Sequence, residues 1–123
     1  MVNSFEEELK RANTYCLRLL SSRARSEYEV RTRLERRGCP AGIIESLLAS
    51  LKKRGLIDDL AFSKEWIVSR SRTSPRGIRL ISRELEAKGV SVDIIEQALD
   101  ETGVSRDEKH VAEALALKKI GTV

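Results

Sequence analysis

The sequence predicts an all-α protein of tandem three-helix repeats, with two complete units and the first helix of a third. Three observations support this fold class. Apolar residues recur every three or four positions, a glycine-based helix terminator appears repeatedly, and no stretch shows the alternation of a β-strand. We expect the first repeat over residues 1–57, the second over 58–104 and the partial third over 105–123.

The first unit should contain three helices, over residues 4–22, 26–38 and 40–55. The first two begin at capping boxes, in which a serine and a glutamate three residues later each accept a hydrogen bond from a backbone amide. These pairs are Ser4 with Glu7 and Ser26 with Glu29. The third helix begins at a proline, whose missing amide is not needed in the first turn.

The second unit should contain three further helices, followed by one helix of the partial third unit. Asp58 and Asp59 predict the start of the fourth helix, since carboxylates there accept bonds from free amides. Ser74 as the cap and Pro75 as the first helical residue predict a fifth helix that continues to Lys88. The sixth helix is expected over residues 91–102, and a capping box of Ser105 with Glu108 opens the seventh.

A helix terminator recurs four times and reveals an internal repeat. Each copy has a leucine, a glycine four residues later and then an apolar residue, which is typical of a left-handed glycine stop. The copies are Leu34-Gly38-Cys39, Leu51-Gly55-Leu56, Leu85-Gly89-Val90 and Leu99-Gly103-Val104. A shift of 51 residues aligns the first unit with the second and places Tyr15 on Trp66.

The sequence contains no pattern typical of a catalytic or cofactor site. The single histidine, His110, has no cluster of metal ligands around it, and no glycine-rich phosphate-binding loop is present. Cys16 and Cys39 fit no metal motif and are expected to be free thiols in a reducing compartment. We therefore expect no enzyme activity, no cofactor and no metal. No apolar run approaches the length of a membrane span, so a cytoplasmic location is expected.

The functional hypothesis rests on the basic residues of the chain. The net charge is +4, and the stretch 10–37 is strongly basic whereas 93–108 is acidic. Arginines also gather in the second unit, where three of them share one face of the fifth helix. Because the guanidinium fork suits carboxylates and phosphates, we predict a partner-binding or nucleic-acid-binding surface at Arg70, Arg72, Arg76, Arg79 and Arg83.

One alternative remains open for the arginines, and a separate prediction concerns the two aromatic residues. The arginine stripe could be a solvated helix face with local partners such as Glu84 and Glu86. Phe62 and Trp66 have the spacing of a buried stripe, and we predict that they belong to the core and are not a platform for stacking bases.

Taken together, the motifs resemble the RecX family of bacterial regulatory proteins. The residues that carry the resemblance are Arg25-Ser26-Glu27, Gly55-Leu56-Ile57-Asp58-Asp59, Phe62, Trp66, Arg70, Arg79 and Glu84-Leu85-Glu86-Ala87-Lys88-Gly89-Val90. The resemblance covers essentially the whole chain and implies a modular array of three-helix repeats. Two positions depart mildly from the family pattern: Val30 stands where leucine is usual, and Ser63 where alanine is usual.

The resemblance also implies a partner. Members of the family bind the RecA recombinase filament on single-stranded DNA and inhibit its recombinase, ATPase and coprotease activities. The resemblance therefore implies a non-catalytic regulator of DNA repair, recombination and the SOS response, expected to act as a monomer. Single- or double-stranded DNA could also contact its basic helix faces without sequence preference. The alternative is a direct DNA-binding regulator that uses the fourth and fifth helices as a helix-turn-helix.

Overall fold

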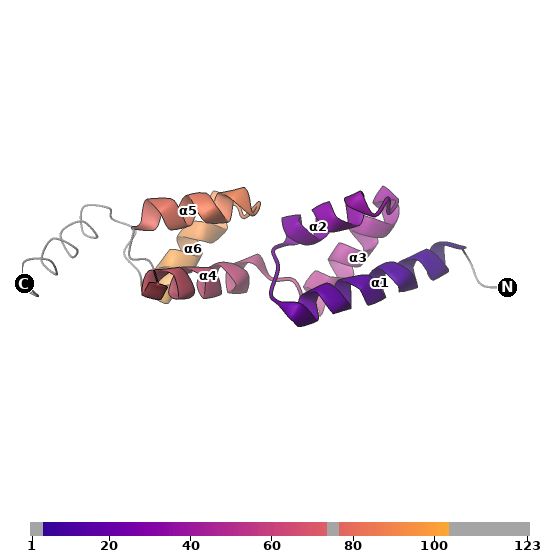
Figure 1. Ribbon diagram of the computed structural model, residues 1–123, viewed down its shortest axis with the longest axis horizontal. Coiled ribbons are helices and arrows are strands. Elements are labelled where there is room, and N and C mark those ends of the chain that lie inside the picture. The colour runs from indigo at the N-terminus through magenta and orange to yellow at the C-terminus, as the bar shows by residue number, and fades with distance from the viewer. Residues whose placement is uncertain (1–3, 74–76, 104–123) are drawn as a thin grey trace, which may run out of the picture. The chain divides into compact units, whose positions relative to one another are not determined.

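The computed structural model describes residues 4–73 and 77–103. The chain divides into two compact units, here called the first unit (Met1–Asp59) and the second unit (Leu60–Val123). The first unit contains α1 (Ser4–Ser22), α2 (Glu27–Arg36) and α3 (Ala41–Lys53). Both α1 and α2 pack against α3 (Figure 1).

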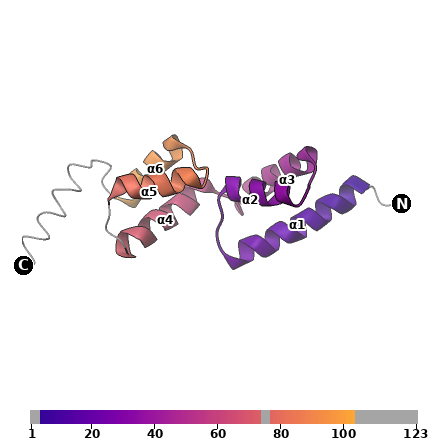
Figure 2. The ribbon, with the colours of Figure 1, turned by 45° about the horizontal axis from the view of Figure 1, so that its top comes forward.

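The second unit is formed by α4 (Asp59–Thr73, which begins on the last residue of the first unit), α5 (Ile78–Ala87) and α6 (Val92–Thr102). Helices α5 and α6 pack together, and α4 completes this three-helix group (Figure 2). The described residues are helical with no strand, which confirms the predicted all-α class. The seventh helix, predicted within 105–123, lies outside the described residues.

The predicted glycine stops are present after α2, α3 and α5, whereas the fourth includes Val104, which lies outside the described residues. At the end of α2, Gly38 has a φ of +78°, and the amide of Cys39 donates to the carbonyl oxygen of Leu34 at 3.1 Å. The equivalent bond after α5 joins the amide of Val90 to the carbonyl of Leu85, also at 3.1 Å. Both are the long bonds of the Schellman motif, which satisfies a carbonyl at the helix end.

Each unit has its own apolar core. The buried residues of the first unit come from all three helices and from the segment after α3: Ala12, Cys16, Val30, Leu34, Ile43, Ile44, Leu47, Leu48, Leu51 and Ile57. Those of the second unit are Phe62, Ile67, Ile78, Ile81, Leu85, Val90, Ile95, Ala98 and Leu99, with Trp66 packed at the edge. Units of this size bury most of their apolar side chains only when all three helices pack together.

The start of the fifth helix was predicted wrongly. Helix α5 begins at Ile78, and its N-cap is Gly77 with a φ of +91° and no side-chain hydrogen bond. Pro75 is therefore not its first helical residue. Glycine adopts a positive φ readily, whereas this conformation is strained for a residue with a side chain. Because Gly77 has this non-helical conformation, the helix begins after it. Arg76 lies outside the described residues, so α5 carries Arg79 and Arg83 of the predicted three-arginine stripe.

One polar side chain lies inside the second core. Ser63 is fully buried on α4, and its hydroxyl has no hydrogen-bond partner within the described part of the chain. Buried hydroxyls usually have a partner, because burial without one is unfavourable. Ser63 thus occupies a position whose surroundings suit an apolar side chain.

Candidate interaction surface

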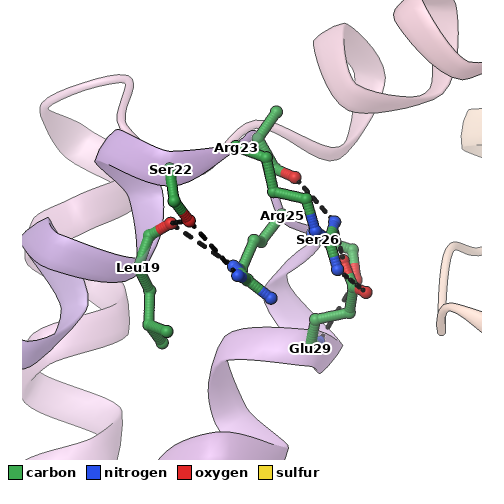
Figure 3. A network of polar contacts seen from close by, with 7 residues as sticks. Leu19, Ser22, Arg23, Arg25, Ser26 and Glu29 are labelled. Atoms are coloured by element: carbon green, nitrogen blue, oxygen red, sulfur yellow. Dashed lines mark hydrogen bonds and ion pairs between the residues drawn. The ribbon is translucent and has the colours of Figure 1, made fainter.

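The turn between α1 and α2 is held by a network of polar contacts (Figure 3). The Ser26 hydroxyl accepts a bond from the amide of Glu29 at 3.2 Å, and the Glu29 carboxylate accepts one from the amide of Ser26 at 3.1 Å. This is the predicted capping box. Arg23 adds an ion pair to Glu29 at 3.0 Å. The network therefore anchors the start of α2 and uses the second carboxylate oxygen of Glu29.

Arg25 connects this turn to the end of α1. Its Nε donates to the carbonyl oxygen of Leu19 and its Nη2 to the hydroxyl of Ser22, both at 3.4 Å. Both distances are at the long end for a hydrogen bond, so these contacts fix the direction of the guanidinium but contribute little to stability. Burial lowers the pKa of Arg25, and the neighbouring charges of Arg23 and Arg33 lower it further. Arg25 therefore lies in a locally positive region.

Asp59 caps the same helix from the far end of the first unit. Its Oδ1 accepts a hydrogen bond from the amide of Glu27, the first residue of α2, at 2.9 Å. Burial raises the pKa of Asp59, and the bond from Glu27 offsets part of this rise. The Arg25-Ser26-Glu27 and Gly55–Asp59 motifs therefore meet at one helix start, where they satisfy backbone amides.

In the second unit, Arg70 is part of an ion pair between α4 and α5. It donates to both carboxylate oxygens of Glu84, from Nε at 3.0 Å and from Nη2 at 2.8 Å. The indole nitrogen of Trp66 donates to the same carboxylate at 3.0 Å. The bond from Arg70 lowers the pKa of Glu84, against the opposing effect of partial burial. Arg70 thus has an intramolecular role at a site where the sequence predicted a partner contact.

The two aromatic residues related by the 51-residue repeat occupy equivalent environments. The guanidinium carbon of Arg37 lies 4.0 Å from the centroid of the Tyr15 ring. The ammonium of Lys88 lies 4.6 Å from the Trp66 ring, and Lys88 follows Arg37 by 51 residues. Trp66 also stacks with Phe62 at a centroid distance of 6.2 Å. Such cation–π and aromatic contacts are those of a helix-packing position, not of a free stacking platform.

The remaining predicted site residues are not gathered into one site. Arg79 and Arg83 are exposed on α5. Arg72 belongs to α4, and Arg76 lies outside the described residues. A helix face that carries Arg79 and Arg83 can contact an acidic surface or a phosphate, but no cavity accompanies it among the described pockets.

Neither a metal-binding cluster nor a membrane-spanning helix is found among the described residues. Within 4–73 and 77–103, no three His, Cys, Asp or Glu side chains gather closely enough to hold a metal ion. Burial raises the pKa of Cys16 to about 11, so its thiol is protonated at neutral pH and is a poor nucleophile. No described helix is long and apolar enough to cross a membrane.

The predicted site did not include the surface arginines of the first unit. Arg11 and Arg18 on α1, and Arg33 and Arg36 on α2, are all exposed. The basic character of residues 10–37 was the signal that could have located them.

The fold and the surface define an all-α protein of two tandem three-helix domains with exposed arginines on its helices. Residues 12–51 match the model of the RecX first three-helix domain, and residues 58–99 match that of the RecX second three-helix domain. The chain belongs to the RecX family. The resemblance inferred from the sequence is confirmed.

Relatives named regulatory protein RecX occur in Mycobacteroides abscessus and Mycolicibacterium vanbaalenii. The chain is 42% identical to that of Mycobacteroides abscessus over 98 residues, which are 80% of this chain and 47% of the relative. It is 37% identical to that of Mycolicibacterium vanbaalenii over 123 residues, covering 94% of this chain and 67% of the relative. The chain thus spans about half to two thirds of the length of these relatives.

Solved structures agree with this assignment. A crystal structure of regulatory protein RecX matches with a TM-score of 0.77 and 26% identity, over 94% of this chain and 56% of that one. RecX from Lactobacillus salivarius matches with a TM-score of 0.74 over 76% of this chain and 61% of that one. At 24% identity, the second likeness concerns the fold alone.

Proposed function

We propose that this protein is a non-catalytic regulator that binds the RecA–single-stranded DNA filament and inhibits the recombinase, ATPase and coprotease activities of RecA. The observation that carries the proposal is the pair of RecX domains, which together extend from residue 12 to residue 99. On this proposal the protein acts as a monomer in the bacterial cytoplasm and modulates DNA repair and recombination.

The proposed contact with the filament includes the exposed arginines of α5. Arg79 and Arg83 are four residues apart and therefore lie on one face of the helix. Arg72 and Arg76 extend this set in the sequence, and both remain part of the proposal. Arg70 is the weakest member, because its guanidinium is already engaged by Glu84.

The test measures RecA ATPase on single-stranded DNA, titrated with this protein at two salt concentrations. Inhibition that weakens at the higher salt concentration supports an electrostatic contact. We expect charge reversal of Arg76, Arg79 and Arg83 together to weaken inhibition without unfolding the protein, as checked by circular dichroism. Unchanged inhibition by a folded triple variant overturns the residue assignment, and no inhibition by the natural protein overturns the function.

A matched control separates a local contact from a general effect of net charge. The double variant R79E/R83E is compared with K10E/K53E, which makes the same charge change at two exposed lysines of the first unit. We expect only the first to lose inhibition. Equal losses would mean that net charge and not this face governs binding. Tight binding of one duplex sequence would instead indicate the alternative, a direct DNA-binding regulator.

A further inference from the structure

The cations of the first unit divide into two groups by their partners. One group is neutralised within the unit, as in the ion pairs Arg23–Glu29, Arg31–Glu45 and Lys52–Glu27. The other group has no acidic partner among the described residues. It includes four exposed arginines, Arg11, Arg18, Arg33 and Arg36.

On α2 the two groups lie on different sides of the helix. Arg33 and Arg36 are three residues apart and share one side. Arg31 lies on roughly the opposite side at 3.6 residues per turn, where it reaches Glu45 of α3. The ion pairs between α2 and α3 join Arg31 to Glu45 and Glu27 to Lys52, and both lie on the side of α2 that faces α3. The side of α2 that carries Arg33 and Arg36 is therefore left without a neutralising carboxylate from the described residues.

On α1 a stripe of three residues faces the end of α2. Arg11, Tyr15 and Arg18 follow the i, i+4, i+7 spacing of a single helix face. The Tyr15 ring lies under the guanidinium of Arg37, the C-cap residue of α2. The contact shows that this face of α1 is directed toward α2, so the unpaired arginines of both helices border the same region.

Two further observations support placing the arginines of α1 and α2 along one region. At one end, Arg25 touches the last turn of α1 and lies close enough to Arg33 for that charge to lower its pKa. At the other end, a hollow of about 270 Å³ lies between α1 and the α2–α3 turn, lined by Arg11 and Arg37 with one carboxylate, Glu8. We call Arg11, Arg18, Arg25, Arg33, Arg36 and Arg37 the α1–α2 basic surface.

We propose that the α1–α2 basic surface binds the phosphate backbone of single-stranded DNA. All six cations are arginines, whose planar fork forms two-point contacts with phosphate oxygens. A row of positive side chains between two helices can follow one strand, whereas duplex recognition usually inserts a projecting helix into a groove. The inference rests on the proposed function only for the choice of single-stranded over double-stranded DNA.

The experiment measures binding of the full chain to a fluorescein-labelled oligothymidylate by fluorescence anisotropy, over a series of salt concentrations without RecA. The test variant R33Q/R36Q removes two unpaired arginines from α2. The control variant R31Q/K52Q removes the same charge from paired positions of the same unit. We expect about a tenfold weaker affinity for R33Q/R36Q and a salt slope smaller by about 1.4, or 0.7 per lost contact. R31Q/K52Q should stay within about threefold of the natural protein.

Further variants locate the contact. R11Q/R18Q should weaken binding as R33Q/R36Q does, because it removes the matching arginines of α1. R79Q/R83Q alters the α5 face that is proposed to contact the filament, and loss of oligothymidylate binding in this variant alone would place the strand on α5 instead. Far-UV circular dichroism of each variant verifies that the helices are retained.

Several outcomes would overturn the inference. They are no binding by the natural protein, equal losses in R33Q/R36Q and R31Q/K52Q, or loss in R79Q/R83Q alone. Loss of RecA inhibition by R33Q/R36Q with unchanged oligothymidylate binding would assign the surface to an acidic protein partner instead. Failure of the proposed function is recognised separately, since the natural protein would then bind the oligothymidylate yet leave RecA ATPase unchanged.

Discussion

Arg70 of α4 and Glu84 of α5 form a two-point ion pair, with nitrogen–oxygen distances of 3.0 and 2.8 Å. The indole of Trp66 donates to the same carboxylate. Charge-assisted bonds of this geometry are stronger than neutral ones. Three residues that are adjacent only in the folded chain thus join two helices of the second unit, and their effect on stability can be measured.

Replacing Glu84 by glutamine should destabilise the second unit by about 1–3 kcal/mol, because the charged acceptor of Arg70 and Trp66 is lost. Urea unfolding followed by the fluorescence of Trp66, the only tryptophan, measures this change. Glu86→Gln is the control, since Glu86 is exposed on the same helix, and should change stability by less than about 0.5 kcal/mol. Equal effects of the two changes would contradict a special role for the ion pair.

The same ion pair should make stability depend on pH. The bond from Arg70 holds the pKa of Glu84 below its ordinary value of 4.5, so the unfolded chain takes up protons at this group first as the pH falls. The stabilisation is therefore present above about pH 4.5 and is lost as the pH falls through the lowered pKa. The difference in stability between the natural protein and E84Q should shrink over this range. A difference that is constant from pH 7 to pH 3 would refute the prediction.

Replacing Ser63 by alanine should stabilise the second unit by about 1 kcal/mol. The change removes a buried hydroxyl that lacks a partner among the described residues and leaves no large cavity. Alanine also has the higher helix propensity, so Ser82→Ala in α5 serves as the control for that contribution. Thermal or urea unfolding by Trp66 fluorescence gives both values. A destabilised S63A protein would show that the hydroxyl has a partner after all.

Two glycines of the first unit should respond oppositely to alanine. At Gly38 the φ of +78° disfavours a side chain although no atom lies within 4 Å of an added Cβ, so G38A should destabilise by about 1 kcal/mol. Gly42 lies within α3 and also has open space around an added Cβ, so G42A should stabilise by about 0.5–1 kcal/mol. Denaturation followed by far-UV circular dichroism compares them. Equal signs for both changes would contradict this explanation of the helix stop.

Much of the architecture was accessible from local patterns. The capping box at Ser26 and the glycine stop at Gly38 depend on residues within a few positions of each other, and both are present. The start of α5 was missed because the Ser74-Pro75 pattern is also local but competes with Gly77, whose backbone conformation decides the helix start. Neighbouring serine, proline and glycine residues can predict that a helix begins, but not at which of them it begins.

The surface was harder to predict, because charge pairing is not local. Glu84 was considered as a partner of nearby arginines, yet its partner is Arg70, 14 residues earlier on another helix. Likewise, the sequence shows that residues 10–37 are basic but not that Arg31 is neutralised by Glu45 of α3 while Arg33 and Arg36 are not.

The sequence by itself determined the all-α class and the 51-residue repeat, because both depend on the spacing of residues along the chain, and its motifs carried the resemblance to the RecX family. The tertiary structure decided which arginines stay available for a partner. Packing α4 beside α5 brings Arg70 to Glu84, and packing α2 on α3 brings Arg31 to Glu45, so those charges are neutralised. Coulombic attraction acts over distances in space, and only the packed helices set those distances.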